Sequence, residues 1–322
     1  MRRELTIIIP INVAHLGPIE GLSGCYVDLL GRLSHDFPME VILVDSSSPE
    51  IFQCIELQLA GTVIQHLRTP DSFKCGKNDK LNNISYGLSV STGKSIAIFD
   101  DDLRPTSENI RTLIACLHEF DFLKCMVNFP NASIFDLVDL SGIYIVNLLS
   151  KHRQFWANFC FRRELILGTG FPCKDVLFDE LAFEMKFRTV TNNHCYLIAP
   201  SIPMHSFRCF PKFLEQRVRY AYENLAYPMR SLIFLSLVPL AAAILCLRGV
   251  LALCLFISVI TVIVLALSRL GEFRYGSIYQ QRSVWIYAPI WFWFYPFTTW
   301  IAVYLWCIGG IRFGNSLIRR AV

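Results

Sequence analysis

The feature that most constrains this 322-residue chain is a long, almost uncharged run near its C-terminal end. Residues 231–268 contain one charged side chain, Arg248, and as one straight helix they would extend roughly 57 Å, nearly twice the hydrocarbon thickness of a bilayer. The run is therefore expected to fold back on itself at Arg248-Gly249. We expect two membrane helices, at about residues 231–247 and 250–268.

A second apolar segment follows at residues 283–311, which carry no charge and hold five of the six tryptophans of the chain. Tryptophans are enriched where a protein meets the surface of a membrane. Pro289 and Pro296 interrupt this segment. Residues 284–308 are therefore expected to form either one kinked spanning helix or a re-entrant hairpin that does not cross.

Arginines flank the second segment on both sides: Arg269, Arg274 and Arg282 precede it, and Arg312, Arg319 and Arg320 follow it. The positive-inside rule places both clusters on the cytoplasmic side of the membrane. A single crossing between them would break that rule. The pattern thus favours a re-entrant or interfacial segment.

The rest of the chain has the composition of a soluble domain, because nearly all acidic residues precede Tyr227. We predict a soluble domain over residues 1–228 and a membrane region over 229–322. The apolar run Leu5–Ile11 is too short for a secretory signal, which favours an integral membrane protein with a cytoplasmic domain, in the cell membrane if the source is bacterial. The net charge of +4 comes largely from arginines beside the apolar segments, which favours anionic lipids over nucleic acid.

Short runs rich in β-branched residues alternate with helix-length segments in the soluble part. The runs are Leu5–Ile11, Glu40–Asp45 and Ser95–Phe99, and polar residues follow each of them: Asn12, Asp45 with Ser46 to Ser48, and Asp100 with Asp101 and Asp102. This rhythm predicts an α/β fold with a Rossmann-like sheet. Ligands of such sheets bind beyond the carboxyl ends of the strands.

The triplet Asp100-Asp101-Asp102 is the strongest local signal. Carboxylates that repel each other stay together when a positive charge lies between them, and a hard cation, Mg²⁺ or Mn²⁺, bridging them to a diphosphate meets this need. Taken alone, any one aspartate is better explained as a turn residue or a helix cap, but polar patches at three successive strand ends favour a binding site.

Two further groups could take part in the chemistry. Asp179-Glu180, at the start of a helix-like segment, could supply a general base, or could simply cap that helix. Gln216, Arg219 and Tyr220 share one helix face, which suits a diphosphate and a sugar or acceptor ring. The alternative for the second group is an amphipathic helix on the membrane surface.

In this order the residues resemble glycosyltransferase family 2 of the GT-A fold, and the membrane-anchored ceramide glucosyltransferase-like branch in particular. The motifs are Asp45, Lys80-Leu81-Asn82-Asn83, Asp100-x-Asp102, Asn158 to Arg163 with Gly170-Phe171, Asp179, and Gln216-x-x-Arg219-Tyr220. The resemblance covers about residues 5–228, and the membrane segments also fit that branch.

The resemblance implies a role for each matching position. Asp179 is the implied catalytic base, and Asp100 and Asp102 are implied to bind Mg²⁺ or Mn²⁺ together with the donor diphosphate. Asp45 is implied to contact the nucleotide base. The other predicted contacts of the nucleotide-sugar are Pro10, Asn12, Lys80, Asn82, Gln216, Arg219 and Tyr220.

Three positions depart from the family pattern. Phe178-Asp179 replaces the usual Glu-Asp, and Glu180 follows, so that Glu180 is an alternative base. Tyr220 replaces a tryptophan and adds a hydroxyl group. His205 stands where some relatives have a metal-ligating histidine, although a histidine after a strand can also be purely structural.

We therefore expect a membrane-bound inverting glycosyltransferase that moves a sugar from a nucleotide diphospho-sugar, by analogy a UDP-sugar, to a hydroxyl group of a lipid. One alternative is a processive polysaccharide synthase, for which two or three membrane segments are too few to build a channel in a monomer. Another is a catalytically silent membrane-bound scaffold with the same fold. The sequence gives no indication of an oligomeric state.

Overall fold

The computed structural model describes residues 3–13, 24–150, 152–205, 210–276, 283–313 and 316–322. The chain divides into two compact units. Unit 1 comprises Met1–Pro130 and Phe155–His205, and unit 2 comprises Asn131–Gln154 and Ser206–Val322. Arg282, which was predicted to be a flanking charge on the cytoplasmic side, lies outside the described residues.

Unit 1 is built on a seven-stranded mixed sheet in the order β3-β2-β1-β4-β6-β5-β7. Strand β6 runs antiparallel to its neighbours β4 and β5, and the other neighbouring strands pair in parallel. The strands are β1 (Leu5–Ile11), β2 (Met39–Asp45), β3 (Gln65–Arg68), β4 (Ser95–Phe99), β5 (Phe122–Asn128), β6 (Asn158–Arg162) and β7 (His194–Pro203). The α/β class and the three strands expected from the sequence are confirmed.

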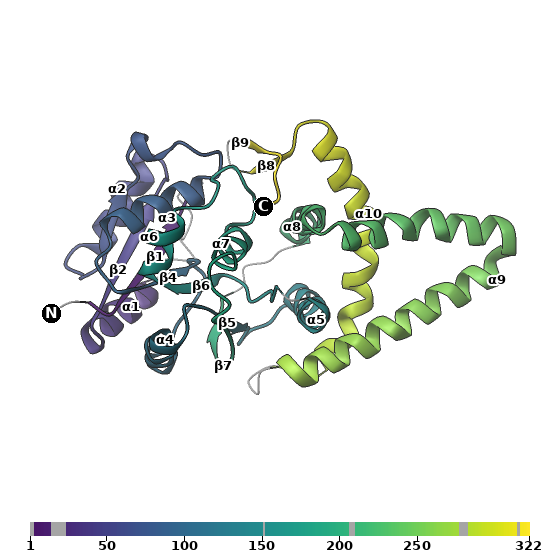
Figure 1. Cartoon of the computed structure of the whole chain (residues 1–322), viewed down its shortest axis with the longest axis horizontal. Helices are drawn as coiled ribbons and strands as arrows, with labels where there is room; N and C mark the ends of the chain where they lie inside the picture. Colours follow the sequence, from purple (N-terminus) through teal and green to yellow (C-terminus); the bar gives the residue numbers. More distant parts are fainter. Residues whose placement is uncertain (1–2, 14–23, 151, 206–209, 277–282, 314–315) are drawn as a thin grey trace. The chain divides into compact units, whose positions relative to one another are not determined.

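Helices cover the sheet, which explains why β1 and β2 are apolar runs buried at every position. Helix α3 packs on β1 and β2, and α4 packs on β5, β6 and β7. The helical elements of unit 1 are α1 (Gly24–Asp36), α2 (Pro49–Leu59), η1 (Asp71–Phe73), α3 (Asp79–Val90), α4 (Ser107–Glu119), α6 (Arg163–Thr169) and α7 (Asp179–Phe187). Figure 1 shows these helices around the strands.

Because β1, β2 and β4 are parallel, the polar residues that follow them emerge at one edge of the sheet. The buried side chain of Asn83 in α3 ties this edge together. Its Nδ2 donates to the carbonyl oxygens of Ile11 and Val44, at 3.1 and 3.2 Å, and its Oδ1 accepts from the Thr69 hydroxyl at 2.7 Å. The ends of β1 and β2 are thus fixed by side-chain hydrogen bonds as well as by the sheet.

Unit 2 is mainly helical. Its elements are α5 (Ile134–Leu149), α8 (Phe210–Glu223), η2 (Asn224–Ala226), α9 (Pro228–Tyr275), η3 (Val284–Tyr287), α10 (Ala288–Cys307), β8 (Ile311–Phe313) and β9 (Ser316–Ile318). Helix α5 therefore belongs with the C-terminal helices. The predicted functional boundary at residue 228 coincides with the start of α9 and stays a prediction.

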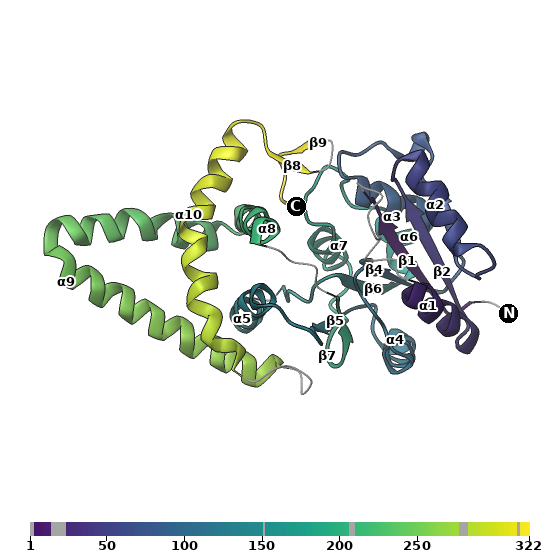
Figure 2. The same cartoon turned by 180° about the vertical axis from the view of Figure 1, so that it is seen from behind.

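Helix α9 is bent at Gly249, whose φ of 79° and ψ of −179° separate two helical arms. Glycine tolerates this positive φ because it has no Cβ. The bend lies at the turn expected from the sequence, and Figures 1 and 2 show the two arms diverging from it. Within the described residues, α9 is the one helix long and apolar enough to cross a membrane, with a mean hydropathy of 3.2 over its most apolar 18 residues, of which 6% are buried.

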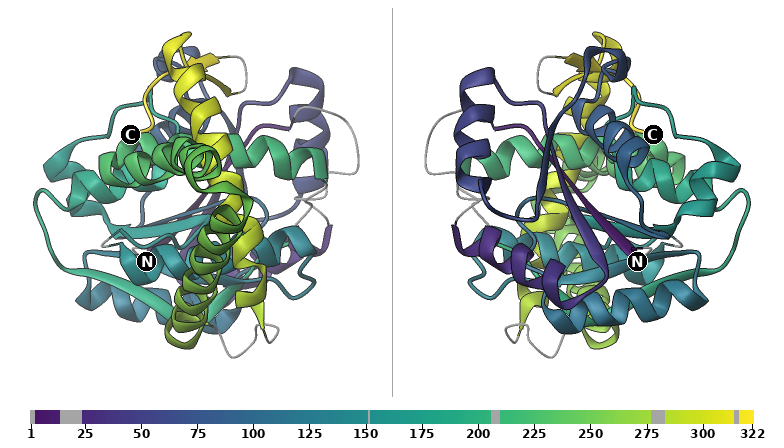
Figure 3. Two further views of the ribbon diagram at one scale, coloured as in Figure 1. Left: turned by 90° about the vertical axis from the view of Figure 1, so that its right-hand side faces the viewer. Right: turned by 90° about the vertical axis from the view of Figure 1, so that its left-hand side faces the viewer.

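Helix α10 runs beside α9 and is continuous through Pro296. The left-hand view of Figure 3 shows it next to the arms of α9. The interruption expected at the prolines is therefore absent from α10. Pro289 lies in the first turn, where a proline removes no helical hydrogen bond, and Pro296 is accommodated within the helix.

Small residues bring the helices of unit 2 close together. A Cβ on Gly142 of α5 would lie 2.0 Å from an indole carbon of Trp291 in α10, and one on Gly271 of α9 would lie 2.3 Å from the Tyr144 carbonyl oxygen. The hydroxyl of Ser268 donates to the Ser141 carbonyl at 2.9 Å. Small residues thus allow α5 to pack closely against α9 and α10.

Candidate active site

A partly buried lysine lies between two aspartates at the carboxyl edge of the unit 1 sheet. Lys80 Nζ is 2.7 Å from Asp100 Oδ1 and 3.0 Å from Asp179 Oδ2. Lys80 comes from the first turn of α3, Asp100 follows β4, and Asp179 begins α7. The sequence led us to expect a metal ion among the carboxylates of the Asp100–Asp102 triplet, and the structure places the Lys80 ammonium between one of these, Asp100, and the predicted base Asp179.

Burial and the neighbouring charges act in opposite directions on the pKa values of this cluster. Burial disfavours the charged ammonium, but the Asp100 and Asp179 carboxylates outweigh it and raise the pKa of Lys80. Burial also raises the pKa of Asp100, and the Lys80 charge only partly offsets this. Lys80 is therefore a permanent cation of the site.

Two loops are clasped together so that Lys80 and Asp179 meet. Asn78, the N-cap of α3, donates from Nδ2 to the Val176 carbonyl at 2.8 Å, and its backbone N–H donates to the Lys174 carbonyl at 3.1 Å. A Cβ on Gly76 would lie 2.1 Å from Lys174 Cβ, so that only glycine allows this approach. The first turns of α3 and α7 are thereby fixed relative to each other.

Asn82, predicted as a donor contact, is buried and forms part of this clasp. Its Oδ1 accepts from the Gly76 N–H at 3.0 Å, and its Nδ2 donates to the Gly76 carbonyl at 2.8 Å. The neighbouring Asn83, which binds the strand ends, was not among the predicted site residues. Only its inclusion in the Lys-x-Asn-Asn motif pointed to it.

Glu180 lies beside the cluster, and its carboxyl group binds Ala157, a residue with an unusual backbone conformation. Its Oε1 accepts from the Ala157 N–H at 2.8 Å, and the Ala157 carbonyl accepts from the Asp100 N–H at 2.9 Å. Ala157 has a φ of 61°, in the left-handed region that disfavours residues other than glycine. The Glu180 carboxyl thus supports the segment that positions Asp100.

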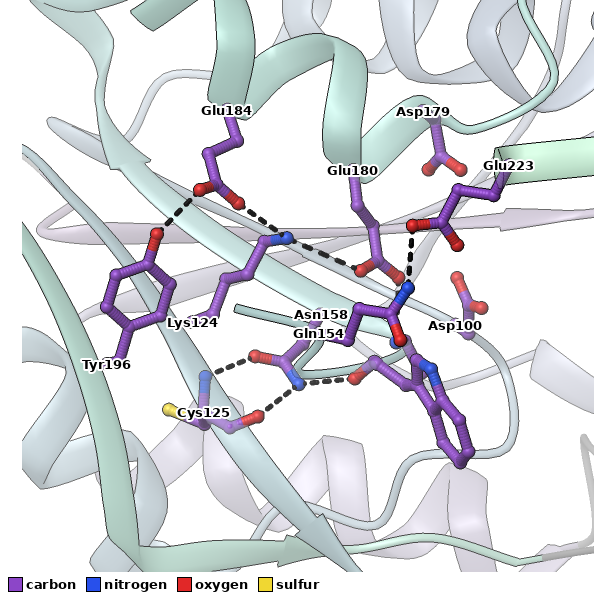
Figure 4. A network of polar contacts seen from close by, with 12 residues as sticks. Asp100, Lys124, Cys125, Gln154, Asn158, Asp179, Glu180, Glu184, Tyr196 and Glu223 are labelled. Carbon is purple, nitrogen blue, oxygen red and sulfur yellow. Dashed lines mark hydrogen bonds and ion pairs between the residues drawn. The ribbon is translucent and has the colours of Figure 1, made fainter. Parts of the chain in front are cut away.

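Behind Glu180 runs a chain of buried polar groups that sequence reasoning missed (Figure 4). Lys124 Nζ of β5 lies 3.8 Å from Glu180 Oε2 and 3.0 Å from Glu184 Oε2, and the Tyr196 hydroxyl donates to Glu184 Oε1 at 2.6 Å. Burial raises the pKa of Glu180 to about 8; Lys124 opposes this shift and Asp179 adds to it. The spacing of Glu180 and Glu184, one turn apart on α7, was the available signal.

At the ends of β1 and β2 the predicted residues differ in exposure. Pro10 is buried in β1, whereas Asn12 is exposed just beyond it. Asp45 is fully buried: its Oδ1 accepts from the Ser47 N–H at 2.7 Å, and its Oδ2 lies 3.2 Å from His66 Nε2. Both Asp45 oxygens are therefore engaged within the protein.

Arg104, two residues after the acidic triplet, adds another cation beside it. Arg104 Nη1 donates to the Asp101 carbonyl at 2.7 Å, and its guanidinium lies 3.8 Å from the ring centroid of the buried Tyr26. The His205 N–H donates to the Asp102 carbonyl at 2.8 Å, so that these two predicted metal ligands lie on adjacent backbone. Partial burial, with a smaller contribution from Arg104, lowers the pKa of His205.

Among the described residues, no group of three or more histidine, cysteine, aspartate or glutamate side chains is arranged to hold a metal ion. Mg²⁺ is commonly held by one or two carboxylates together with phosphate oxygens of a substrate. The donor set of Asp100 and Asp102 fits an ion that arrives with a diphosphate, and not a pre-formed cage.

The remaining predicted residues lie on α8 in unit 2. Gln216, Arg219 and Tyr220 are partly exposed, and the Arg219 guanidinium lies 5.0 Å from the ring centroid of Phe313. Between them, Arg217 is buried, forms an ion pair with Asp139 of α5, and contacts the ring of Tyr220. Unit 1 thus brings together Lys80, Asp100, Asp179 and their neighbours, and α8 carries the other group.

Comparison with known proteins shows the fold. No family model and no curated protein matches the chain. A mannosyltransferase from Pyrobaculum calidifontis, solved with GDP-Man and Mn²⁺, matches with a TM-score of 0.57 and 14% identity over 93% of this chain and 88% of that chain. Glucosyl-3-phosphoglycerate synthase from Mycobacterium tuberculosis, solved with Mn²⁺ and UDP-glucose, matches with a TM-score of 0.46 and 15% identity over 68% and 77%. The chain therefore has a GT-A-like α/β fold with a mixed sheet, similar to that of the mannosyltransferase.

Proposed function

We propose that the protein is a membrane-bound inverting glycosyltransferase that moves a sugar from a nucleotide diphospho-sugar to a hydroxyl group of a lipid. The observation that carries this proposal is the Lys80–Asp100–Asp179 cluster at the carboxyl edge of a GT-A-like sheet. Ligands of open α/β sheets bind at this edge. The cluster offers a carboxylate base and a fixed cation within one small volume.

Asp179 is the proposed base. It removes the proton of the acceptor hydroxyl as the oxygen attacks the anomeric carbon, and the nucleoside diphosphate leaves from the opposite face. Glu180 is less suited to this role, because a carboxyl group with a pKa of about 8 is mostly protonated at pH 7. Its hydrogen bond to Ala157 gives it a positioning role.

Asp100 and Asp102 are the proposed ligands of Mg²⁺ or Mn²⁺, with His205 as a third candidate. The bound ion would act as a Lewis acid that stabilises charge on the leaving diphosphate. The mannosyltransferase of similar fold was solved with Mn²⁺ and GDP-Man, which supports a divalent ion. The Lys80 ammonium, 2.7 Å from Asp100 Oδ1, would bind oxygens of the donor diphosphate as a point charge.

The other donor contacts are proposed by position. Asn12 is exposed at the end of β1, and Asp45 fixes Ser47 and His66 at the end of β2, where a nucleotide base would lie. Gln216, Arg219 and Tyr220 are proposed to contact the diphosphate and the acceptor. A UDP-sugar is the first choice of donor, and GDP-mannose is the second because of the mannosyltransferase.

The lipid acceptor follows from the membrane region. The two arms of α9 are proposed to span the bilayer as a hairpin, with the continuous helix α10 lying at the membrane interface, so that residues 1–228 form a cytoplasmic domain. Large apolar side chains on α9 are exposed, including Leu247, Leu251 and Phe273. A lipid hydroxyl at the membrane surface could then reach an enzyme anchored there without leaving the bilayer.

The first experiment measures nucleoside diphosphate release by the detergent-purified full-length protein from a panel of UDP-sugars and GDP-mannose, with Mn²⁺ or Mg²⁺ and added membrane lipids. Asp179→Asn should lower turnover by about 10²- to 10⁴-fold, the usual contribution of a general base. Asp102→Asn and chelation of the metal should also abolish turnover. Asp71→Asn, at a side chain that is 96% exposed, is the matched control.

Turnover that survives in Asp179→Asn would remove that residue from the role of base and leave Glu180 as the candidate. Folded protein that turns over no donor in the panel would favour the silent-scaffold alternative.

A further inference from the structure

The Lys80 ammonium is placed so that it affects any other cation that Asp100 binds. Its Nζ lies 2.7 Å from Asp100 Oδ1 and 3.0 Å from Asp179 Oδ2, so that two carboxylates share one positive charge. Hydrogen bonds between charged groups at such distances are among the stronger ones in proteins. Asp100 is also a proposed ligand of Mg²⁺ or Mn²⁺. Two cations of different kinds are therefore candidates for the same carboxylate.

The three side chains are only partly exposed to water. Their exposed fractions are 21% for Lys80, 32% for Asp100 and 10% for Asp179. Charges that are partly buried interact more strongly than charges on an open surface, because water and salt screen them less. A divalent ion at Asp100 would therefore be repelled by the ammonium that already pairs with this carboxylate.

The backbone on both sides of Lys80 is fixed by Asn78. The Asn78 side chain accepts at Oδ1 from the Leu81 N–H at 3.3 Å, and its carbonyl oxygen accepts from the Asn82 N–H at 3.1 Å. Asn78 is in turn bound to the Val176 carbonyl oxygen through Nδ2. The first turn of α3 thus holds the Lys80 backbone in place. Rotation about its side-chain bonds then remains as the way for the ammonium to reach a new partner.

A diphosphate changes this competition, because it brings negative charge of its own. Lysine binds phosphate as a point charge, and Mg²⁺ is usually held by one or two carboxylates together with phosphate oxygens of a substrate. A nucleoside diphosphate therefore offers the Lys80 ammonium another anionic partner and offers the ion additional oxygen ligands. Both effects favour joint binding of the ion and the nucleotide. By linkage, each ligand should then strengthen the binding of the other by the same factor.

We propose that Lys80 makes binding of the divalent ion conditional on the nucleoside diphosphate. Lys80 competes with the ion for Asp100, and a bound diphosphate ends this competition by pairing with the ammonium. The inference rests on the proposed function, in which Asp100 takes part in holding the ion, and it assigns to Lys80 the coupling between metal and donor. The protein then takes up the ion together with its donor rather than beforehand.

The test is equilibrium dialysis of Mn²⁺ against the detergent-purified full-length protein, without nucleotide and with UDP or GDP. In the wild type the nucleotide should tighten Mn²⁺ binding by about 5- to 150-fold, the usual range of coupling between two ligands. Without nucleotide, Lys80→Gln should bind Mn²⁺ about tenfold more tightly than the wild type, because a competing charged hydrogen bond is removed. With saturating Mn²⁺, the same variant should bind UDP or GDP about tenfold more weakly, because the diphosphate loses a cation.

Lys74→Gln is the matched control, because Lys74 is a more exposed lysine of the preceding loop and pairs with Asp71. It removes the same charge and should bind Mn²⁺ like the wild type. Equal tightening in Lys74→Gln and Lys80→Gln would show a general effect of net charge and overturn the proposal. Unchanged Mn²⁺ binding in Lys80→Gln would also overturn it. Lys80→Arg keeps a cation and should keep the weak binding of Mn²⁺ alone, which separates loss of charge from altered packing.

Two further measurements keep the test decisive. Mn²⁺ alone should raise the Tm of Lys80→Gln more than that of the wild type, which also shows that the variant folds. Adding Asp100→Asn to Lys80→Gln should remove the gain in Mn²⁺ binding, and a gain that persists would mean that the ion binds elsewhere. Coupled Mn²⁺ and nucleotide binding that Lys80→Gln leaves unchanged would contradict the role of Lys80 but not the proposed function. Folded protein that binds no Mn²⁺ even with UDP or GDP would contradict both.

Discussion

At the scale of single residues, Glu180 makes stability depend on pH. Its folded pKa of about 8 lies above its ordinary value of 4.5. Between these two values the folded protein keeps a proton that the unfolded chain has lost, so that stability falls as pH rises from about 4.5 to about 8 and is then constant. Glu180→Gln removes this titration and can still accept the hydrogen bond from Ala157.

Between about pH 5 and about pH 8, we therefore expect the Tm of the wild type to fall relative to that of Glu180→Gln. Above about pH 8 the Tm values of the two proteins should change in parallel. Glu108→Gln, at an exposed position of α4, is the control and should show no such trend. A difference between wild type and Glu180→Gln that does not change with pH would contradict the prediction. Glu180→Gln should also lose far less activity than Asp179→Asn.

Ala157 gives a second prediction at this scale, because its positive φ is rare for a residue with a Cβ. The left-handed conformation costs an L-residue roughly 1–2 kcal/mol, while glycine loses about 0.4–1 kcal/mol through the entropy of the unfolded chain. Ala157 is also buried, and the loss of its methyl group costs about 0.8 kcal/mol, so Ala157→Gly should change stability by no more than about 1 kcal/mol in either direction. Ala157→Val should destabilise the protein, since branching at Cβ adds crowding.

Denaturant unfolding compares these variants with Ala97→Gly, at a buried and extended position of β4. The control should lose stability, because glycine there removes a buried methyl group and adds entropy to the unfolded chain. Equal losses at positions 157 and 97 would show that the backbone of Ala157 is not strained.

At the scale of elements, the clasp between the loops before α3 and α7 should control activity. Gly76→Ala places a methyl group 2.1 Å from Lys174 Cβ and 2.9 Å from the Lys174 carbonyl oxygen, so that the two backbones must separate. Lys80 and Asp179 lie just beyond these loops and would separate with them. Turnover should fall together with stability.

Gly31→Ala is the control for this substitution. Gly31 lies within α1, and nothing lies within 4 Å of a Cβ added there. Alanine is the better helix former, by about 1 kcal/mol, so that this variant should be as stable as the wild type or more stable, with unchanged turnover. If Gly76→Ala behaves in the same way, the clasp does not position the site.

The elements also show which parts of the fold could be predicted. Strands β1, β2 and β4 were predicted with nearly their observed bounds, because each is a short run rich in buried β-branched residues between polar turns. Strand β5 was missed, since Lys124 in its centre suggests exposure. That lysine is buried because Glu180 and Glu184 of α7 face it, and local sequence does not reveal this pairing.

The candidate site was predicted in the same partial way. The carboxylates at strand ends and the Asp179-Glu180 pair follow from local pattern, and the resemblance to a family supplied Lys80. The distances that join Lys80 to both aspartates depend on segments 20 and 99 residues apart in the sequence. Local patterns therefore indicated a cation between carboxylates, but only the folded chain shows that a lysine already occupies such a position.

At the scale of the whole molecule, the arrangement of the membrane region can be tested with short epitope reporters. One reporter follows Gly61, an exposed turn of unit 1 where nothing lies within 4 Å of an added Cβ, and one follows Gly249 at the bend of α9. A third is attached after Val322. Exposed loop tips and chain ends tolerate such additions best. Antibody binding is compared before and after permeabilisation of the cells.

If the arms of α9 cross as a hairpin and α10 does not cross, only the reporter at Gly249 should bind antibody before permeabilisation. The arginines on both sides of α10 favour this arrangement, because the positive-inside rule keeps Arg269 and Arg319 on the same side. Binding at both Gly249 and Val322 would show that α10 spans the bilayer. Binding at none of the three positions would mean that α9 lies in the membrane surface, since its far end would then never reach the outer side.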